Sequence, residues 1–193
     1  MPERINTQYS NTYNRRSTAK QKGMTFIEVL IALVIMVTGI LGAVAMQASA
    51  KKGSFDAMQR SLASSLAQDI VERMRGNNSA TLALYAASSP YGTGKIISSP
   101  TCNSGAALCT PAQMVTHDLY GWEQYLMGAG AVNGTNNVGG LVNGVGCIAV
   151  IGNAVTVVVT WQGKTKYTDA NRGDGCGTTS TTRRQVVVDA FII

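Results

Sequence analysis

A long apolar stretch near the start of the chain constrains what this sequence can fold into. Residues 29–45 carry no charge. A helix of about 17 residues is about 25 Å long. The hydrocarbon core of a bilayer is about 30 Å thick, so this run alone is slightly too short to span it. Adding residues 24–27 extends it to a plausible span. With 193 residues, the chain is long enough for one membrane segment and one folded domain.

A single carboxylate, Glu28, opens this apolar stretch. A charge at membrane depth costs about 2.5–3.5 kcal/mol, so Glu28 needs a partner or a function. A secretory signal peptide cut after residues 48–50 and a plain single-span anchor both leave Glu28 without a role. The third interpretation is a cut between Gly23 and Met24, which keeps the apolar run as an assembly helix.

The charge distribution indicates how the chain is oriented. The net charge is +6, and residues 1–23 contribute +4 of it, with five basic residues against one acidic residue. Positive charge before an apolar segment retains that end in the cytoplasm, so the rest of the chain should face the periplasm or the exterior. The remainder shows no basic stripe interleaved with aromatic residues, and nucleic-acid binding is not expected.

The pattern after residue 45 predicts that the helix continues. Apolar residues recur there at spacings of three or four: Phe55, Met58, Leu62, Leu66, Ile70 and Met74. This spacing predicts an amphipathic half-helix over 54–75, continuous with the apolar run from about Met24 and ended by Gly76-Asn77. Residues 77–109 contain many Ser, Pro, Gly and Asn residues, and this composition predicts that the segment is mostly loop.

The second half of the chain predicts a short helix and then strands. Thr110, Pro111 and Gln113 form a helix-start signature, which predicts a helix over 111–127. Its expected buried face is Met114, Val115, Leu119, Trp122 and Leu126. A Gly/Asn-rich connection follows over 128–146. The β-rich runs at about 147–151, 154–161 and 184–192 predict antiparallel strands, so the expected fold class is α+β.

The four cysteines all follow the apolar segment: Cys102, Cys109, Cys147 and Cys176. An even number on the far side of a membrane suits disulfides in an oxidising compartment. Four cysteines allow three connectivities, and proximity favours Cys102 with Cys109 and Cys147 with Cys176. Each bridge is expected to be structural and to contribute about 2–4 kcal/mol.

No catalytic constellation stands out. The single histidine, His117, lies on the predicted short helix and is expected to be a surface or core residue. The cysteine spacing does not suit zinc, and no phosphate-binding loop or metalloprotease motif is present. We therefore expect a protein that is not an enzyme and has no metal, cofactor or small-molecule substrate. The pair Arg183-Arg184 is expected to be a solvated strand start rather than a contact with a neighbour.

The residues Lys-Gly-Met-Thr-Phe-Ile-Glu-Val-Leu at 22–30 closely resemble the class III leader and cleavage site of type IV pilins and type II secretion pseudopilins. The resemblance implies that a prepilin peptidase cuts after Gly23 and methylates Met24. Glu28 would then be the fifth residue of the mature chain, and its carboxylate would pair with the amine of a neighbouring subunit inside the membrane or fibre. The implied fold is a long N-terminal helix packed on an antiparallel β-sheet head.

Four further segments resemble the PilV family of type IV pilus modification proteins. They are Ile40-Leu41-Gly42, residues 68–77, Asp118-Leu119 with Trp122, and 157–161. The resemblance implies a minor pilin that primes pilus assembly with other minor pilins and the major pilin, in support of adhesion, twitching motility or DNA uptake. The sequence departs from the PilV pattern over residues 127–146.

The resemblance also implies the domain organisation and location. Residues 1–23 would be a leader peptide, 24–50 the transmembrane and assembly half of the helix, and 51–193 a periplasmic head. The protein would lie in the inner membrane and then move to the pilus, at its tip. Two alternatives stay open: a minor pseudopilin of a type II secretion system, and a secreted binding domain released after Ala50.

Overall fold

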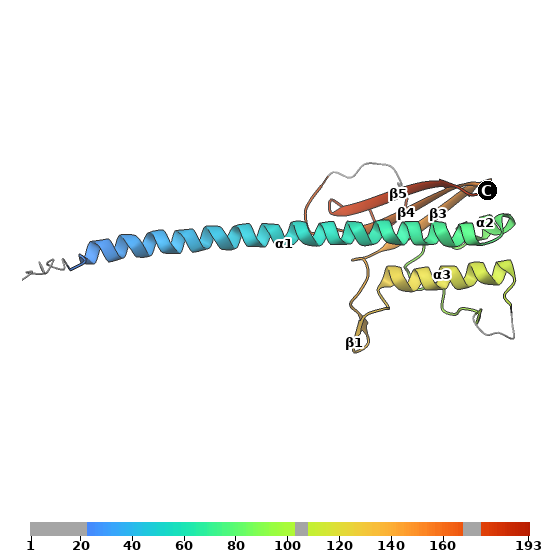
Figure 1. Ribbon diagram of the computed structural model, residues 1–193, viewed down its shortest axis with the longest axis horizontal. Helices are drawn as coiled ribbons and strands as arrows, with labels where there is room; N and C mark the ends of the chain where they lie inside the picture. The colour runs from blue at the N-terminus through green and yellow to red at the C-terminus, as the bar shows by residue number, and fades with distance from the viewer. Residues whose placement is uncertain (1–22, 103–107, 168–174) are drawn as a thin grey trace, which may run out of the picture. The chain divides into compact units, whose positions relative to one another are not determined.

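The computed structural model describes residues 23–102, 108–167 and 175–193 (Figure 1). The chain divides into two compact units, residues 1–44 and 45–193. In the first unit, the described residues are a short segment at 23–25 and the beginning of helix α1, which runs over Phe26–Gly76. Residues 1–22, on which most of the expected leader falls, lie outside the described residues.

Helix α1 confirms the predicted long N-terminal helix, with its start two residues later and its end one residue later than expected. Its interior contains no proline, and Arg73 and Arg75 stand in its last turn, where positive charge complements the helix dipole. The buried residues begin only in the second unit: Gln59, Ala63, Leu66, Ala67, Ile70, Val71 and Met74.

The predicted buried face of α1 is wrong in its first half. Met58 is 58% exposed, and Phe55 and Leu62 are half-buried. The residues that are fully buried instead are the small Ala63 and Ala67. Small side chains let neighbouring elements approach the helix closely, and this rotates the buried stripe away from the larger apolar residues.

The region expected to be mostly loop, 77–109, contains a 3₁₀ turn at Ser79–Thr81 and helix α2 at Leu82–Ala86. The side chain of Asn78 accepts a hydrogen bond from the Ala80 amide and caps the turn. Leu82 and Tyr85 of α2 are buried. A five-residue helix is too short to show helical periodicity in the sequence, so α2 was not predicted, whereas most of the described residues of this segment are loop, as expected.

Helix α3 runs over Pro111–Met127, as predicted. Thr110 and Gln113 form the expected capping box, and Gly128 ends the helix in the left-handed conformation at φ 75°. Two acidic residues, Asp118 and Glu123, are buried on its core face beside the predicted apolar ones.

Three antiparallel strands form the main sheet in the order β3-β4-β5. They are β3 (Val145–Ile151), β4 (Ala154–Gln162) and β5 (Arg183–Phe191), each within two residues of its predicted bounds. Alternate residues of β4 enter the core, among them Val157, Val159 and Trp161. A short hairpin of β1 (Val132–Asn133) and β2 (Asn136–Asn137) lies in the connection that was expected to contain no strands.

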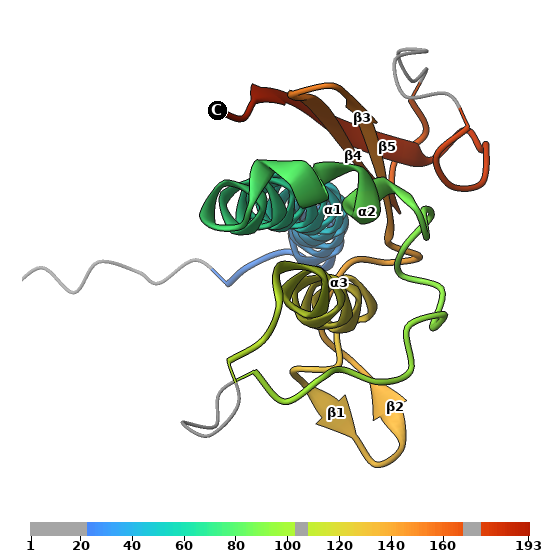
Figure 2. The ribbon, with the colours of Figure 1, turned by 90° about the vertical axis from the view of Figure 1, so that its right-hand side faces the viewer.

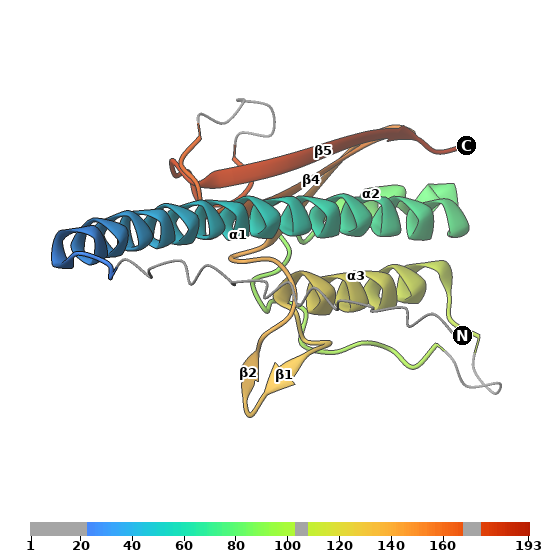
Figure 3. The same ribbon diagram turned by 60° about the vertical axis from the view of Figure 1, so that its left-hand side comes forward.

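The second unit is built in layers. The sheet lies on one side of the α1 segment that belongs to this unit, and α3 lies on the other (Figure 2). The β1–β2 hairpin lies beyond α3, on the side away from the sheet (Figure 3). Disulfides join Cys102 to Cys109 and Cys147 to Cys176, the two pairs that proximity along the chain favours.

Gly146 in β3 gives a test of this packing. A Cβ atom there would lie 2.3 Å from Cη2 of Trp122, which is fully buried. We expect Gly146→Ala to lower the free energy of unfolding by about 1–3 kcal/mol, because neither the strand nor the indole has room to move. The measurement is thermal unfolding of the detergent-solubilised protein. The control is Gly130→Ala, whose Cβ would meet nothing within 4 Å; equal melting temperatures for the two variants would contradict the prediction.

Candidate functional site

The beginning of α1 leaves its apolar surface uncovered. Every described residue from Gly23 to Ala50 is exposed in the single chain, including Met24 at 73% and Phe26 at 80%. In the described part of the chain, α1 is the one helix long and apolar enough to cross a membrane, and its most apolar window has a mean hydropathy of 2.7. Water is a poor solvent for such a surface, so a membrane or other apolar helices must cover it.

Glu28 lies in the first turn of this helix. The carbonyl of Thr25 accepts hydrogen bonds from the amides of Glu28 (3.1 Å) and Val29 (3.3 Å), which places the helix start just before the carboxylate. The positive end of the helix dipole favours an acidic side chain at this position. Glu28 forms no ion pair or side-chain hydrogen bond with the residues that the structure describes. Its carboxylate therefore remains available to a second molecule.

The PilV-like segment 68–77 forms a polar network at the end of α1. Arg73 pairs with Asp69 one turn earlier (Nε–Oδ2 2.9 Å) and reaches Asp118 of α3 (Nη1–Oδ1 3.5 Å). The hydroxyl of Tyr85 donates to Asp118 at 2.7 Å. Asn77 donates to the hydroxyl of Tyr85 at 3.2 Å. The motif thus joins α1, α2 and α3 through charged and polar side chains.

This network shifts the ionisation of its members. Burial lowers the pKa of Arg73, but the carboxylates of Asp69 and Asp118 outweigh burial and raise that pKa above its ordinary value. Burial, together with the negative charge of Asp118, raises the pKa of the Tyr85 phenol well above its usual range. At neutral pH, Tyr85 is therefore a protonated donor to Asp118.

Trp122, which the PilV resemblance also singles out, links α3 to the other layers. Its Nε1 donates to the carbonyl of Leu66 in α1 at 2.8 Å. Its ring meets the ring of Tyr91 edge to face, with centroids 5.5 Å apart. The indole is fully buried in the head. Its apolar surface is shielded from water, and its donor has a hydrogen-bond partner.

Glu123 is a structural residue that the sequence analysis did not single out. Its fully buried carboxylate accepts four backbone hydrogen bonds from one loop: three at Oε1, from Thr93 (3.1 Å), Gly94 (2.8 Å) and Lys95 (3.0 Å), and one at Oε2, from Ile96 (2.8 Å). The carboxylate therefore organises the loop at 93–96. The available sequence signal was its position on α3, one residue after Trp122 and four residues after Leu119, both of which belong to the predicted buried face.

The described residues hold no group of three or more His, Cys, Asp or Glu side chains that could bind a metal ion. His117 is half-buried, and its Nδ1 lies 2.9 Å from the hydroxyl of Ser99 and 3.3 Å from the carbonyl of Pro100. The expectation that Arg183 is solvated is wrong. Arg183 is 5% exposed and donates to the carbonyl of Cys176 at 2.8 Å, because the segment after the second disulfide cysteine covers the outer face of the sheet.

Two family models match the chain in adjacent segments. A model described as the prokaryotic N-terminal methylation motif matches residues 18–44, and one described as type IV pilin Tt1218 matches residues 45–120. The chain belongs to the type IV pilins. No curated protein and no solved structure matches it.

The methylation motif of this type IV pilin contains Gly23, Met24 and Glu28. The second match contains the network residues Asp69, Arg73 and Asp118. Pilins are structural proteins that assemble with other pilins. The uncovered apolar surface of α1 and the unpaired carboxylate at its beginning fit a protein of this kind.

Replacing Glu123 tests whether it anchors the loop of this pilin. We expect Glu123→Gln to lower the free energy of unfolding by about 1–3 kcal/mol, because the amide nitrogen that replaces Oε2 cannot accept from Ile96. Hydrogen exchange should also become faster at the amides of residues 93–96. The control is Glu72→Gln at an exposed pair with Arg75, where about 0–1 kcal/mol is expected. Unchanged exchange in the loop would rule out the anchoring role.

Proposed function

We propose that this type IV pilin is a minor pilin of the PilV kind, which primes pilus assembly together with other minor pilins and the major pilin. A prepilin peptidase cuts it after Gly23 and methylates Met24. Helix α1 first anchors the protein in the inner membrane and then packs among the helices of other subunits. The head faces the periplasm and later the cell exterior, near the tip of the pilus.

The observation that carries the proposal is Glu28 itself. It stands five residues after Gly23, directly before an apolar helix surface that the described chain leaves uncovered, and it has no partner among the described residues. Cleavage after Gly23 creates an amine at Met24. An amine and a carboxylate buried separately are costly, whereas a pair between two subunits satisfies both and fixes their register.

The resemblance of segment 68–77, Asp118 and Trp122 to PilV supports the minor-pilin role. These residues form the contacts between α1 and α3, so the resemblance falls on positions that determine how the head is built. A minor pseudopilin of a type II secretion system is the second candidate, since such proteins share the leader motif. Release of a soluble domain after Ala50 is disfavoured because residues 48–50 lie within α1.

The mature N-terminus tests the processing step. We expect mass spectrometry of the protein purified from its host membrane to find a chain that begins with N-methylated Met24, because the peptidase recognises Gly23 and the residues that follow. A Gly23→Leu variant should retain the leader. A mature chain that begins at Lys51 would instead establish secretion by signal peptidase.

A variant at Glu28 tests the assembly step. We expect Glu28→Gln and Glu28→Ala to insert into the membrane as wild type does and to fall about tenfold or more in the sheared pilus fraction, because the subunit pairing is lost. The control is Thr38→Ala, since within the described part of the chain the Thr38 hydroxyl bonds only to carbonyls of its own helix, at 2.9 and 3.0 Å. Wild-type incorporation of Glu28→Gln would refute the pairing. Co-purification of wild type with secretion-system pseudopilins would favour the second candidate.

A further inference from the structure

Two asparagines of the chain, Asn133 and Asn143, are followed directly by glycine. An Asn-Gly step favours spontaneous deamidation of the asparagine, because glycine has no side chain to hinder its backbone nitrogen and its backbone adopts many conformations. The reaction also requires a free side-chain amide, a free backbone nitrogen and access to water. The structure gives the two asparagines different surroundings in each of these respects.

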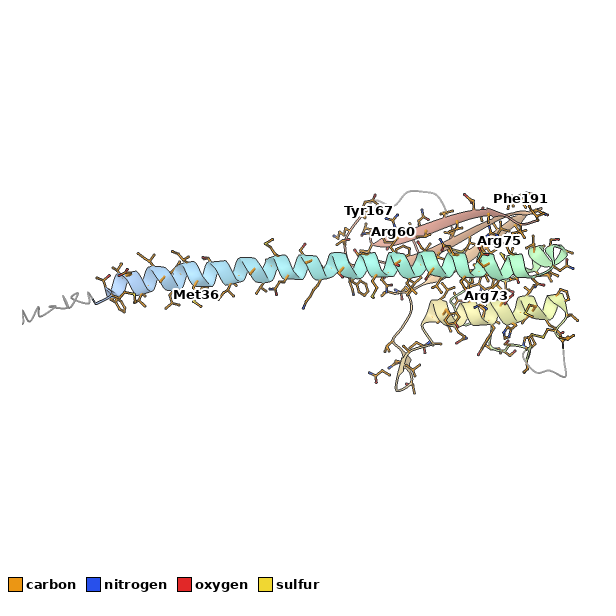
Figure 4. The ribbon with its side chains drawn as sticks, in the orientation of Figure 1. Met36, Arg60, Arg73, Arg75, Tyr167 and Phe191 are labelled. Atoms are coloured by element: carbon orange, nitrogen blue, oxygen red, sulfur yellow. A yellow bond between two sulfur atoms is a disulfide. The ribbon has the colours of Figure 1, made fainter. Side chains whose placement is uncertain are left out.

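Asn133 lies at the tip of the β1–β2 hairpin, where it is exposed and pairs with Asn136 across a turn of two residues. Among the described residues, the side chain of Asn133 has no hydrogen-bond partner and the amide of Gly134 donates no backbone hydrogen bond. A Cβ atom on Gly134 would meet nothing within 4 Å. The tip of the hairpin projects away from α3 (Figure 4). Both reacting groups are therefore free and open to water.

The β1–β2 hairpin is also held by few contacts. Its strands have two residues each, and every residue from 130 to 138 is exposed. A two-stranded hairpin without buried side chains is only marginally stable, so it opens locally at little cost in free energy. Such opening lets the backbone nitrogen of Gly134 turn toward Cγ of Asn133.

Asn143 is held in place although its side chain is exposed. Its side-chain amide donates to Oε1 of Gln162 at 3.0 Å, and the amide of Gly144 donates to the carbonyl of Leu141 at 3.3 Å. Gly144 is buried, and a Cβ atom there would lie 2.7 Å from Cβ of Leu141. The side-chain amide and the backbone nitrogen are both engaged, and the backbone has no room to rotate.

We propose that Asn133 is a site of spontaneous deamidation in the folded head, and that the fold protects Asn143 from the same reaction. This inference does not depend on the proposed assembly function. The hairpin lies within residues 127–146, where the sequence departs from the PilV pattern.

The reaction needs only water as a co-reactant. The backbone nitrogen of Gly134 gives up its proton and forms a bond to Cγ of Asn133, while the bond from Cγ to Nδ2 breaks and ammonia leaves with that proton. The product is a cyclic succinimide, which water then opens. Attack of water at Cγ gives aspartate, and attack at the backbone carbonyl carbon gives isoaspartate, whose main chain runs through Cγ.

Deamidation changes both the charge and the shape of the hairpin. Either product places a carboxylate where the neutral amide stood, which lowers the net charge by one. Isoaspartate also adds a methylene to the main chain between Asn133 and Gly134. A longer main chain in so short a turn does not fit the register in which Asn133 pairs with Asn136.

The first test compares the two asparagines in one sample. The detergent-solubilised full-length protein is incubated at mildly alkaline pH, and its peptides are followed by mass spectrometry. We expect the Asn133 peptide to gain the mass difference between NH₂ and OH about tenfold or more faster than the Asn143 peptide. In urea the two rates should become similar, because both asparagines precede glycine. Equal rates in the folded protein, or a difference that persists in urea, overturn the proposal.

The second test removes each site in turn. We expect Asn133→Gln to abolish the acidic form that accumulates on cation exchange, because glutamine would have to close a larger ring. The matched control is Asn143→Gln, which should accumulate the acidic form as fast as wild type does. Melting temperatures verify that both variants are folded. An undiminished acidic form in Asn133→Gln overturns the proposal.

The third test identifies the product. We expect a methyltransferase specific for isoaspartate to label the Asn133 peptide of incubated wild type and not that of freshly prepared protein. Failure to label the incubated peptide, together with an unchanged mass, overturns the proposal. Asn133-Gly134-Thr135 is also an acceptor sequence for N-glycosylation, in which a sugar occupies Nδ2. A glycan on Asn133 in protein purified from the host would likewise overturn the proposal.

Discussion

The buried indole of Trp122 is the contact on which the packing of the head depends. Its donor reaches the backbone of α1 at Leu66, its ring meets Tyr91, and its far edge occupies the space left by Gly146 of β3. One side chain of α3 therefore fixes the distance of α3 from both α1 and the sheet. The small residues Ala63 and Ala67 matter for the same reason, since α1 must come close to its neighbours for these contacts to form.

The polar network at the end of α1 complements this apolar contact. The pairing of Arg73 with Asp69 and Asp118 and the hydrogen bond from Tyr85 to Asp118 have a defined geometry, whereas apolar surfaces can slide. Buried charged groups seldom add much net stability, because desolvation offsets their attraction. Their larger effect here is to fix the register of α1 against α3. This explains why charged residues stand in a segment that also carries the core residues Ile70 and Met74.

Periodicity in the sequence was sufficient to predict the long elements of the fold. Each long element has a residue pattern of its own that can be recognised in the sequence. This holds for helix α1, for the capping box of α3 at Thr110 and for the three strands. Features set by distant partners were not predictable. Glu123 bonds to four backbone amides, which leave no side-chain signature in the sequence, and Arg183 is buried by a segment whose position depends on the second disulfide.

In the candidate site too, local features were predictable from the sequence and features set by distant residues were not. The position of Glu28 next to a glycine and an apolar run was visible in the sequence because it is local. From the sequence, Trp161 was predicted to end a strand, and it is the last residue of the segment 157–161 that resembles the PilV family. Its burial depends on packing against other elements of the head, and its Nε1 has no hydrogen-bond partner among the described residues.

Glu28 and Trp161 both lack a partner among the described residues, but their surroundings differ. The cost of Glu28 is partly offset in the single chain by the helix dipole, and in the proposed assembly its partner is the amine created by removal of the leader. Trp161 carries a neutral donor that is enclosed in the head, away from solvent. Apolar helix surfaces pack with any apolar partner and so supply free energy without selectivity. In the proposed assembly, selectivity therefore comes from Glu28, because a partner amine that satisfies this carboxylate must match the register of α1.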